Sequence, residues 1–358
     1  MNDTSNTSGM WPNEVASLYG ITDHTDAKGQ CVGILALAGG YLPSDLSAAT
    51  ADIGRQLPLV VDVGINGGSN NFGGGDLADS ELALDLQIIA ALVPSARIVV
   101  YFGPNNIQQL APLIHQAVTD DVNRPKVLSI SWGSAEKFWT ESIRNDVNST
   151  LKDAFNAKVT VVAAAGDQLA TDGLLDGAAH VLFPASSPYV LACGGTQLEL
   201  ASDGTTLLDE KVWNDGFTGT GGGISDVFDV PSYQQNIVLT RSVNDSGLRR
   251  GVPDVSAAAG QTPGYRIILN GKALVKDGTS AAAPVWASLI AMANARRGQP
   301  IGLVQPILYG NPLLCRSILK GNNRVDGVGY DAGPGWNPCT GLGVPNGMDT
   351  VDALVAAT

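Results

Sequence analysis

Short apolar runs alternate with amphipathic stretches along the first half of the chain. The apolar runs are rich in β-branched residues and predict buried strands at residues 31–38, 59–63, 97–102, 127–131 and 159–164. Helical spacing of apolar residues lies between them, at residues 45–56, 77–92, 107–119 and 141–156. Strands that are apolar throughout and alternate with helices predict an α/β fold, with a mostly parallel central sheet and helices on both faces.

The second half of the chain has a less regular pattern. Asp203-Gly204 and Asn270-Gly271 each separate two strand-like runs, which predicts hairpin turns. A long helix is predicted at residues 280–297, ending before Gly298 and Pro300. No charge run or Ser/Pro-rich linker divides the sequence, so we expect residues 1–358 to form a single domain.

Composition excludes some functions. The formal net charge of −13 argues against nucleic acid as a partner, because phosphate binding needs clustered Lys and Arg. No apolar run reaches the roughly 18–20 residues that span a membrane. Residues 1–9 lack the apolar core of a signal peptide, so the chain is either cytosolic or has lost its leader. Four cysteines without CxxC spacing and three histidines predict no zinc or histidine-rich site.

A candidate nucleophile lies in the run from Gly278 to Pro284, which reads Gly-Thr-Ser-Ala-Ala-Ala-Pro. Ser280 stands in the first turn of the predicted helix, where a serine is commonly an N-cap. The small neighbours would also let another chain approach, and the helix dipole favours an anion there. The run resembles the nucleophile motif of the subtilisin-like fold, but no His-Gly-Thr motif supplies a histidine base. We expect His24, His115 and His180 to have surface or core roles.

Two carboxylates lie on one face of the helix predicted at residues 77–92. Glu81 and Asp85 are four residues apart, so they are neighbours on the helix surface. They could form a solvated face. The flanking residues are mostly Leu and Ile, however, which indicates burial, and a buried carboxylate pair is costly unless it shares a proton. A shared proton is what a relay to a serine requires.

A third acidic residue ends the Ala-Ala-Ala-Gly-Asp run that follows the strand at residues 159–164. Asp167 could be a turn residue at the end of that strand. In subtilisins a similar run ends in the asparagine of the oxyanion hole. A protonated aspartate could donate a hydrogen bond to an oxyanion, whereas an ionised one would repel it.

With these residues together, the chain resembles the sedolisins, which are serine-carboxyl peptidases, and in particular their kumamolisin-like branch. Further runs match that family in order along the chain: Ser-Ile-Ser-Trp-Gly at 129–133, Phe-Pro-Ala-Ser-Ser-Pro at 183–188, Cys-Gly-Gly-Thr at 193–196, Gly-Gly-Gly-Ile-Ser at 221–225 and Gly-Pro-Gly-Trp at 333–336. The resemblance implies a subtilisin-like fold and an acid-active serine endopeptidase.

The resemblance also implies a role for each residue of the site. Ser280 attacks the peptide carbonyl, Glu81 acts as general base and then acid, and Asp85 orients Glu81. Protonated Asp167 and the Ser280 N–H stabilise the oxyanion. Trp132 supports the acidic pair. Backbone of the substrate would bind along Gly221, Gly222 and Gly223, with Leu182 at the S2 subsite.

The sequence departs from the family pattern at two of these places. The family extends its acidic relay to a glutamate on the first core strand, and Ala36 occupies that position here. We therefore expect the relay to end at Asp85 or to be extended by water. Leu182 stands where kumamolisin-like enzymes have an aspartate near the S2 pocket, so a more apolar pocket is expected.

A third departure concerns calcium, which family members bind near the C-terminus through two aspartates and backbone carbonyls. The matching positions here are Ser317, Ile318, Gly333, Gly335 and Asn337, with neither aspartate. We expect no cofactor, with weakened calcium binding as the remaining possibility. A disulfide between Cys315 and Cys339 could replace the metal. The alternative is a pair of buried free thiols.

The family also implies the biological setting. We expect polypeptide substrates, an inhibitory propeptide that is absent from these 358 residues, secretion, and a monomer. The competing hypothesis is a homologue with the same fold that binds polypeptides without cleaving them.

Overall fold

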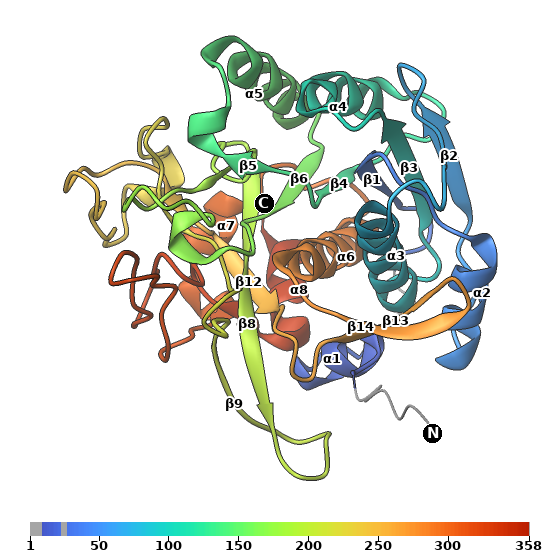
Figure 1. Ribbon diagram of the computed structural model, residues 1–358. Helices are drawn as coiled ribbons and strands as arrows, with labels where there is room; N and C mark the ends of the chain where they lie inside the picture. The colour runs from blue at the N-terminus through green and yellow to red at the C-terminus, as the bar shows by residue number, and fades with distance from the viewer. Residues whose placement is uncertain (1–8, 23–26, 358) are drawn as a thin grey trace.

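A computed structural model describes residues 9–22 and 27–357. Eight strands of this described part form the central sheet, in the order β12-β8-β6-β4-β1-β3-β2, with β9 antiparallel against β8 and all other neighbours parallel (Figure 1). The bounds are β1 (Cys31–Leu37), β2 (Val60–Gly64), β3 (Arg97–Gly103), β4 (Val127–Ile130), β6 (Thr160–Ala164), β8 (Val190–Leu200), β9 (Leu207–Val212) and β12 (Val255–Ala258). The predicted α/β class, a mostly parallel sheet of the subtilisin-like kind, is confirmed.

The remaining strands of the described residues form four short antiparallel pairs. They are β5 (Ser134–Ala135) with β7 (Leu182–Phe183), β10 (Gly223–Ile224) with β11 (Gly251–Val252), β13 (Tyr265–Leu269) with β14 (Lys272–Lys276), and β15 (Cys315–Arg316) with β16 (Val344–Pro345). The predicted hairpin turns join β8 to β9 and β13 to β14. Asn270 and Gly271 both have positive φ angles, 51° and 69°, as a two-residue hairpin turn of the primed type requires.

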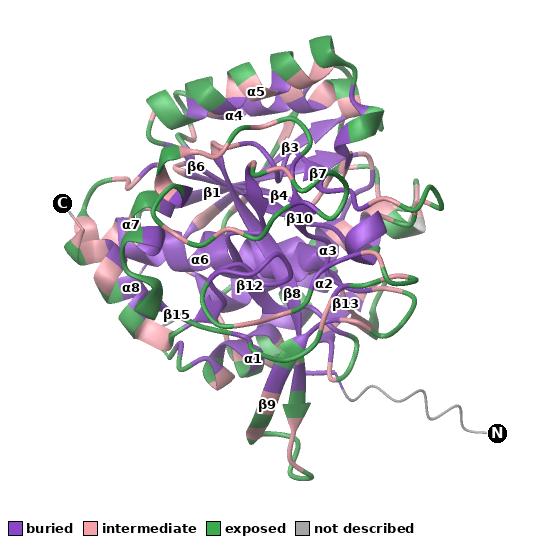
Figure 2. Ribbon diagram, turned by 90° about the vertical axis from the view of Figure 1, so that its left-hand side faces the viewer, coloured by how far each residue is buried: buried purple, intermediate pink, exposed green. Residues whose placement is uncertain are grey.

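Helices cover both faces of the sheet. Their bounds are α1 (Pro12–Leu18), α2 (Pro43–Asp52), α3 (Asp76–Leu92), α4 (Leu110–Thr119), α5 (Glu141–Asn156), α6 (Thr279–Arg297), α7 (Gln305–Gly310) and α8 (Gly347–Ala356). Helices α4 and α5 contribute to one apolar core, and α3, α6 and α8 to the other, with the sheet between them (Figures 1 and 2). No helix in the described ranges is long and apolar enough to cross a membrane.

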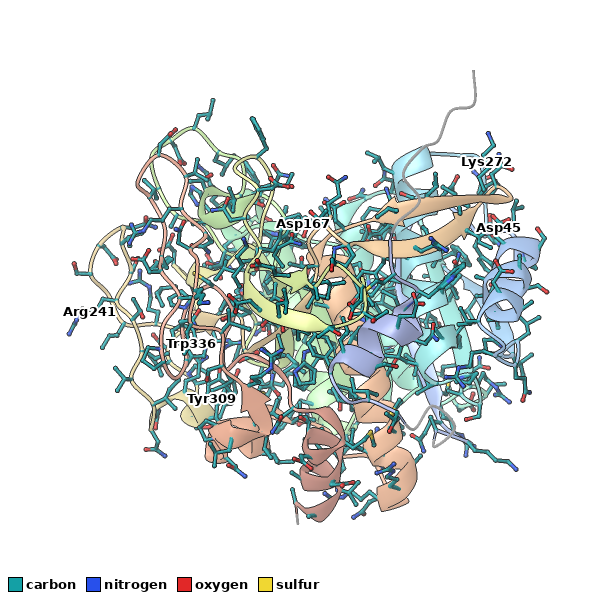
Figure 3. The ribbon with its side chains drawn as sticks, turned by 90° about the horizontal axis from the view of Figure 1, so that it is seen from below. Asp45, Asp167, Arg241, Lys272, Tyr309 and Trp336 are labelled. Atoms are coloured by element: carbon teal, nitrogen blue, oxygen red, sulfur yellow. The ribbon has the colours of Figure 1, made fainter. Side chains whose placement is uncertain are left out.

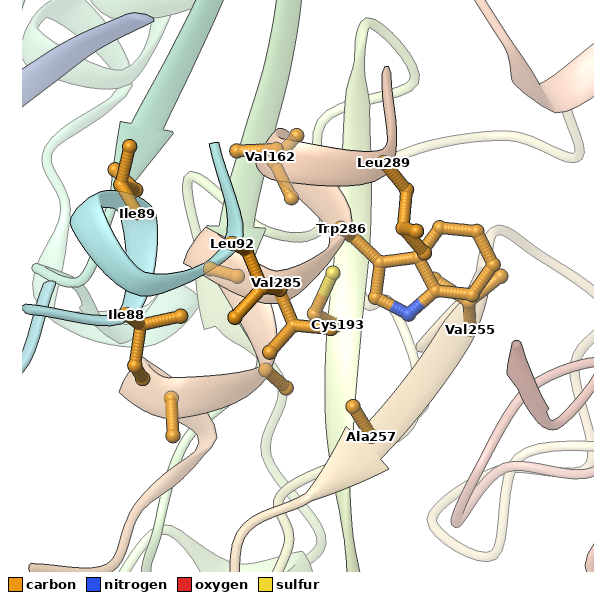
Figure 4. Packing of buried hydrophobic residues seen from close by; sticks show 14 of the residues in the cluster. Ile88, Ile89, Leu92, Val162, Cys193, Val255, Ala257, Val285, Trp286 and Leu289 are labelled. Carbon is orange, nitrogen blue, oxygen red and sulfur yellow. The ribbon is translucent and has the colours of Figure 1, made fainter. Parts of the chain in front are cut away.

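Helix α6 is the central helix of the larger core and carries the candidate nucleophile at its start. Every residue from its first, Thr279, to Asn294 is buried. Its apolar side chains pack between α3 and the sheet, where Val285, Trp286 and Leu289 meet the residues of α3 and of strands β6, β8 and β12 (Figure 4). This packing fixes the position of the α6 N-terminus relative to α3 and the strand ends.

The four cysteines are buried free thiols. The disulfide considered between Cys315 and Cys339 is therefore absent, and the alternative of two free thiols holds. Cys193 lies in the core, as expected. His115 is exposed on α4, and His180 is buried with its Nε2 3.0 Å from the Asp176 carboxylate. His24 lies outside the described residues.

Candidate active site

The four candidate catalytic residues come from three segments that meet at the carboxyl-end edge of the sheet. Glu81 and Asp85 lie on α3, Asp167 follows β6, and Ser280 is the second residue of α6. Asp167 lies in the middle of the molecule, between the side that carries Lys272 and the side that carries Arg241 (Figure 3). In open α/β sheets, binding and catalytic residues usually lie in the loops that follow the carboxyl ends of the parallel strands.

Glu81 and Asp85 form a coupled pair of carboxyls on the inner side of α3. Asp85 is 1% exposed, and Glu81 Oε1 is buried without a hydrogen-bond partner. Burial raises the pKa of Glu81 to about 7, and the nearby Ser280 hydroxyl offsets part of that rise. Burial, followed by the charge of Glu81, also raises the pKa of Asp85 well above its usual range. The pair therefore holds at least one proton over the whole acidic range.

Ser131, directly after β4, links the two carboxyls. Its hydroxyl lies 2.9 Å from Asp85 Oδ1 and 3.1 Å from Oδ2, and donates to this carboxylate. It is also close enough to lower the pKa of Glu81. Among the hydrogen bonds of the described residues, none joins Glu81 directly to Asp85. Ala36 is buried in β1 and offers no polar side-chain group. Among the described residues, Ser131 is the side-chain hydrogen-bond partner of Asp85.

Ser280 is held at the helix start by residues with short side chains. Gly278 precedes the helix with a φ of 126°, a conformation that favours glycine. A Cβ atom at Gly278 would lie 2.9 Å from Asp167 Oδ2, so a side chain there would collide with that carboxyl. The N–H groups of Thr279 and Ala281 are bonded to Asp167 and to the Gly278 carbonyl. Within the described part of the chain, the Ser280 N–H has no partner and remains a free donor.

Thr279 anchors the Asp167 carboxyl through one of its two oxygens. The Thr279 backbone N–H and its hydroxyl each donate to Asp167 Oδ1 at 2.7 Å. The same hydroxyl accepts the Gly166 N–H at 3.0 Å, so its own hydrogen is directed at Asp167. Oδ2 is left for a proton and faces the helix start. Burial raises the pKa of Asp167, and the two hydrogen bonds from Thr279 offset only part of this rise. Part of the residue still faces solvent.

The other predicted site residues surround this centre. Leu182 is buried, and its methyl carbons come within 2.7 Å of the Cβ position of Gly166 and 3.4 Å of that of Gly133. Trp132 is half-buried beside Ser131. Gly221 donates its N–H to the Gly166 carbonyl at 2.7 Å, and the three glycines from 221 to 223 are buried. Their predicted contact with substrate stays a prediction.

Ser131 and Thr279 are the two polar residues of the site to which the sequence analysis gave no role. Ser131 lies next to Trp132 in the 129–133 motif, and Thr279 lies next to Ser280 in the 278–284 motif. The sequence signal that could have identified them is a hydroxyl side chain directly after a buried strand, for Ser131, and at the start of a buried helix, for Thr279. Neither position shows from sequence alone which carboxyl it will meet, because those carboxyls lie 46 and 112 residues away.

Comparisons with known proteins show the family and agree with the fold. The model of the subtilase family matches residues 64–302, so the chain belongs to the subtilase family. Kumamolisin from Bacillus sp. (strain MN-32) is 43% identical over 351 residues, covering 96% of this chain and 63% of kumamolisin. Sedolisin from Pseudomonas sp. (strain 101) is 31% identical, covering 93% of this chain and 59% of sedolisin.

A solved structure gives the same result in three dimensions. Pseudomonas sedolisin, a serine-carboxyl proteinase complexed with two molecules of pseudo-iodotyrostatin, superimposes with a TM-score of 0.85 at 27% identity, covering 96% of this chain and 97% of that chain. The resemblance to kumamolisin-like sedolisins that the motifs indicated is thereby confirmed. The chain spans about three-fifths of the length of the two curated relatives, which are 63% and 59% covered.

Proposed function

We propose that this chain is an acid-active serine endopeptidase that cleaves polypeptides through an acyl-enzyme on Ser280. The observation that carries the proposal is the meeting of three groups at the start of α6. These are the buried Ser280 hydroxyl, the unpartnered buried Oε1 of Glu81 and the Asp167 carboxyl, whose second oxygen is free for a proton.

In the first half of the reaction, Ser280 Oγ bonds to the peptide carbonyl carbon and its proton passes to Glu81. The carbonyl oxygen becomes an oxyanion, which accepts hydrogen bonds from the free Ser280 N–H and from protonated Asp167 Oδ2. Glu81 then gives the proton to the leaving amine as the C–N bond breaks. Water attacks the acyl-enzyme by the same route, and the proton it loses to Glu81 returns to Ser280.

The mechanism sets a pH dependence because it needs Glu81 ionised and Asp167 neutral. These two fractions change in opposite directions with pH, so the rate passes through a maximum between two limbs. The pKa of Glu81, at about 7, places one limb near neutral pH, and burial moves the Asp167 limb above the usual range of an aspartate. Asp85 shares the proton of the coupled pair with Glu81, and Ser131 orients Asp85 by donating a hydrogen bond to it.

Leu182 is proposed to give the S2 subsite an apolar wall. Its side chain packs over Gly166, the residue before Asp167, and beside Gly133, which follows Ser131 and Trp132. A side chain in this position contacts the segment that leads to the oxyanion donor. A hydrocarbon surface without charge offers no partner to Arg or Lys at P2, so we expect no preference for basic residues there.

The test is cleavage of an acid-denatured protein between pH 3 and pH 8 by the wild-type chain and two variants. Ser280→Ala should abolish cleavage, whereas Ser288→Ala should retain it. Ser288 is a matched control, because it is buried in the same helix and its hydroxyl bonds only the Pro284 carbonyl, at 2.8 Å. Equal rates for wild type and Ser280→Ala would refute the proposal and favour a binding homologue. A maximum above pH 7 would refute the assignment of Asp167.

A further inference from the structure

Two segments near the C-terminus meet at a place where the family resemblance implies a calcium ion. The segments contain Ser317 and Ile318 on one side and residues 333–337 on the other. Asn337, at one of the two positions that would need an aspartate, is 4% exposed and lies between them. Its side-chain amide contacts both segments, and the direction of these contacts shows whether the oxygen atoms of the site are free to bind a metal.

Five contacts fix the orientation of the Asn337 amide. Its Oδ1 accepts hydrogen bonds from the Cys339 N–H at 3.1 Å, the Thr340 N–H at 3.0 Å and the Thr340 hydroxyl at 3.1 Å. The Nδ2 group faces the other way, 3.5 Å from the Ile318 carbonyl oxygen and 3.3 Å from the Gly333 carbonyl oxygen. Two backbone donors hold Oδ1, so a flipped amide would place its NH₂ against two N–H groups.

These contacts do not suit a calcium ion. Calcium takes about six to eight oxygen ligands, and carboxylates among them set its affinity. Here two of the carbonyls at the site, those of Ile318 and Gly333, receive an N–H donor instead. Across residues 9–22 and 27–357, no group of three or more His, Cys, Asp or Glu side chains could hold a metal ion.

The charges beside the site point the same way. Arg316 and Lys320 flank Ser317 and Ile318 in the sequence, and they form ion pairs with Glu210 and Asp209. These acidic partners are therefore already engaged by basic side chains. A divalent cation at Asn337 would meet neutral ligands, and these ion pairs leave it no free carboxylate, which disfavours binding.

We propose that the Asn337 amide takes the place of the cation and clamps the two segments together without metal. Its NH₂ group bridges the Ile318 and Gly333 carbonyls, which a metal would otherwise draw together. Its Oδ1 ties the bridge to the turn at Cys339 and Thr340. Stability of this chain is accordingly independent of calcium.

The first test measures thermal unfolding of the full chain at pH 7, with Ser280→Ala introduced to prevent self-cleavage. The midpoint should differ by less than about 1 °C between 5 mM EGTA and 5 mM CaCl₂. A rise of about 3 °C or more with calcium would overturn the proposal, because a ligand that binds the folded state stabilises it by mass action. Retention of about one calcium per chain after desalting, measured by atomic emission, would overturn it as well.

The second test replaces the amide itself in the same background. Asn337→Asp at pH 7 turns a carboxylate oxygen toward the Ile318 and Gly333 carbonyls, so its midpoint in EGTA should fall by several degrees. The exposed Asn236→Asp is the charge-matched control and should not shift. Adding Ser317→Asp to Asn337→Asp should create calcium-dependent recovery of the midpoint. An Asn337→Asp midpoint equal to that of the control would overturn the clamp. If this variant fails to fold, the calcium titration of the parent chain still decides.

Discussion

Removing the Thr279 hydroxyl should move one limb of the pH–rate profile upward. In Thr279→Val the backbone N–H still donates to Asp167 Oδ1, but the side-chain bond at 2.7 Å is lost. That bond stabilises the ionised carboxylate, so its loss raises the pKa of Asp167. A hydrogen bond to a charged group contributes about 1.5–3 kcal/mol, which corresponds to about 1–2 pKa units. The Asp167 limb should therefore rise by about 1–2 pH units.

The same variant should also lose rate and stability. Asp167 loses one of its two anchors, so kcat at the optimum should fall, by less than the roughly 100-fold or more that loss of a whole oxyanion donor costs. The buried Gly166 N–H loses its acceptor, which should cost about 1–3 kcal/mol of folding free energy. Thr279→Ser retains the hydroxyl and should behave like the wild type in all three respects.

The assay is the kcat/KM of a quenched fluorescent peptide measured from pH 2.5 to pH 8.5. Asp167→Asn identifies the limb, because an amide does not titrate and the limb that belongs to Asp167 disappears. The reasoning fails if that limb stays in place or moves to lower pH in Thr279→Val. It also fails if Thr279→Ser shifts the limb as far as Thr279→Val, because the shift would then not report the hydroxyl.

Two further predictions concern specificity and stability. Leu182→Asp should create a preference for Arg or Lys at P2 in a peptide-library profile, and a profile in which the wild type already favours basic P2 residues would contradict the apolar subsite. Arg250→Met should lower the free energy of unfolding by about 3–5 kcal/mol, since Asp254 would stay buried without its bidentate partner. Arg249→Met is the control, because its partners Asp245 and Asp226 are both exposed, so these pairs should contribute at most about 1 kcal/mol in a denaturant titration.

The parallel sheet could be predicted because each of its strands and helices is indicated by the residues of that segment alone. The strand predicted at residues 97–102 is β3 (Arg97–Gly103), and the helix predicted at 77–92 is α3, which begins one residue earlier and ends at the predicted residue. Strands β1, β3 and β6 are apolar over most of their length, so burial on both faces could be inferred without knowing their neighbours. The hairpins β8–β9 and β13–β14 followed from turn dipeptides in the same way.

The bonds inside the site could not be predicted in this way. The sequence placed Asp85 next to Glu81 on one helix face, but the structure connects Asp85 to Ser131 from another strand. For the C-terminal segments it left calcium, a disulfide and free thiols open; the structure has free thiols and an amide bridge at Asn337 that the sequence did not predict. Such contacts depend on side-chain directions at strand and helix ends, which periodicity does not determine.

Burial of the acidic groups also links the lifetime of the folded chain to the acidity of its surroundings. Glu81, Asp85 and Asp167 have pKa values raised above those of an unfolded chain, so folding takes up protons. Their contribution is fully present below the unfolded pKa values of about 4 and is lost as pH rises through the folded ones, about 7 for Glu81. Neutral surroundings therefore weaken the fold, and one of these ionisations, that of Asp167, also stops the proposed chemistry. We therefore expect the folded chain to persist longest in acidic surroundings.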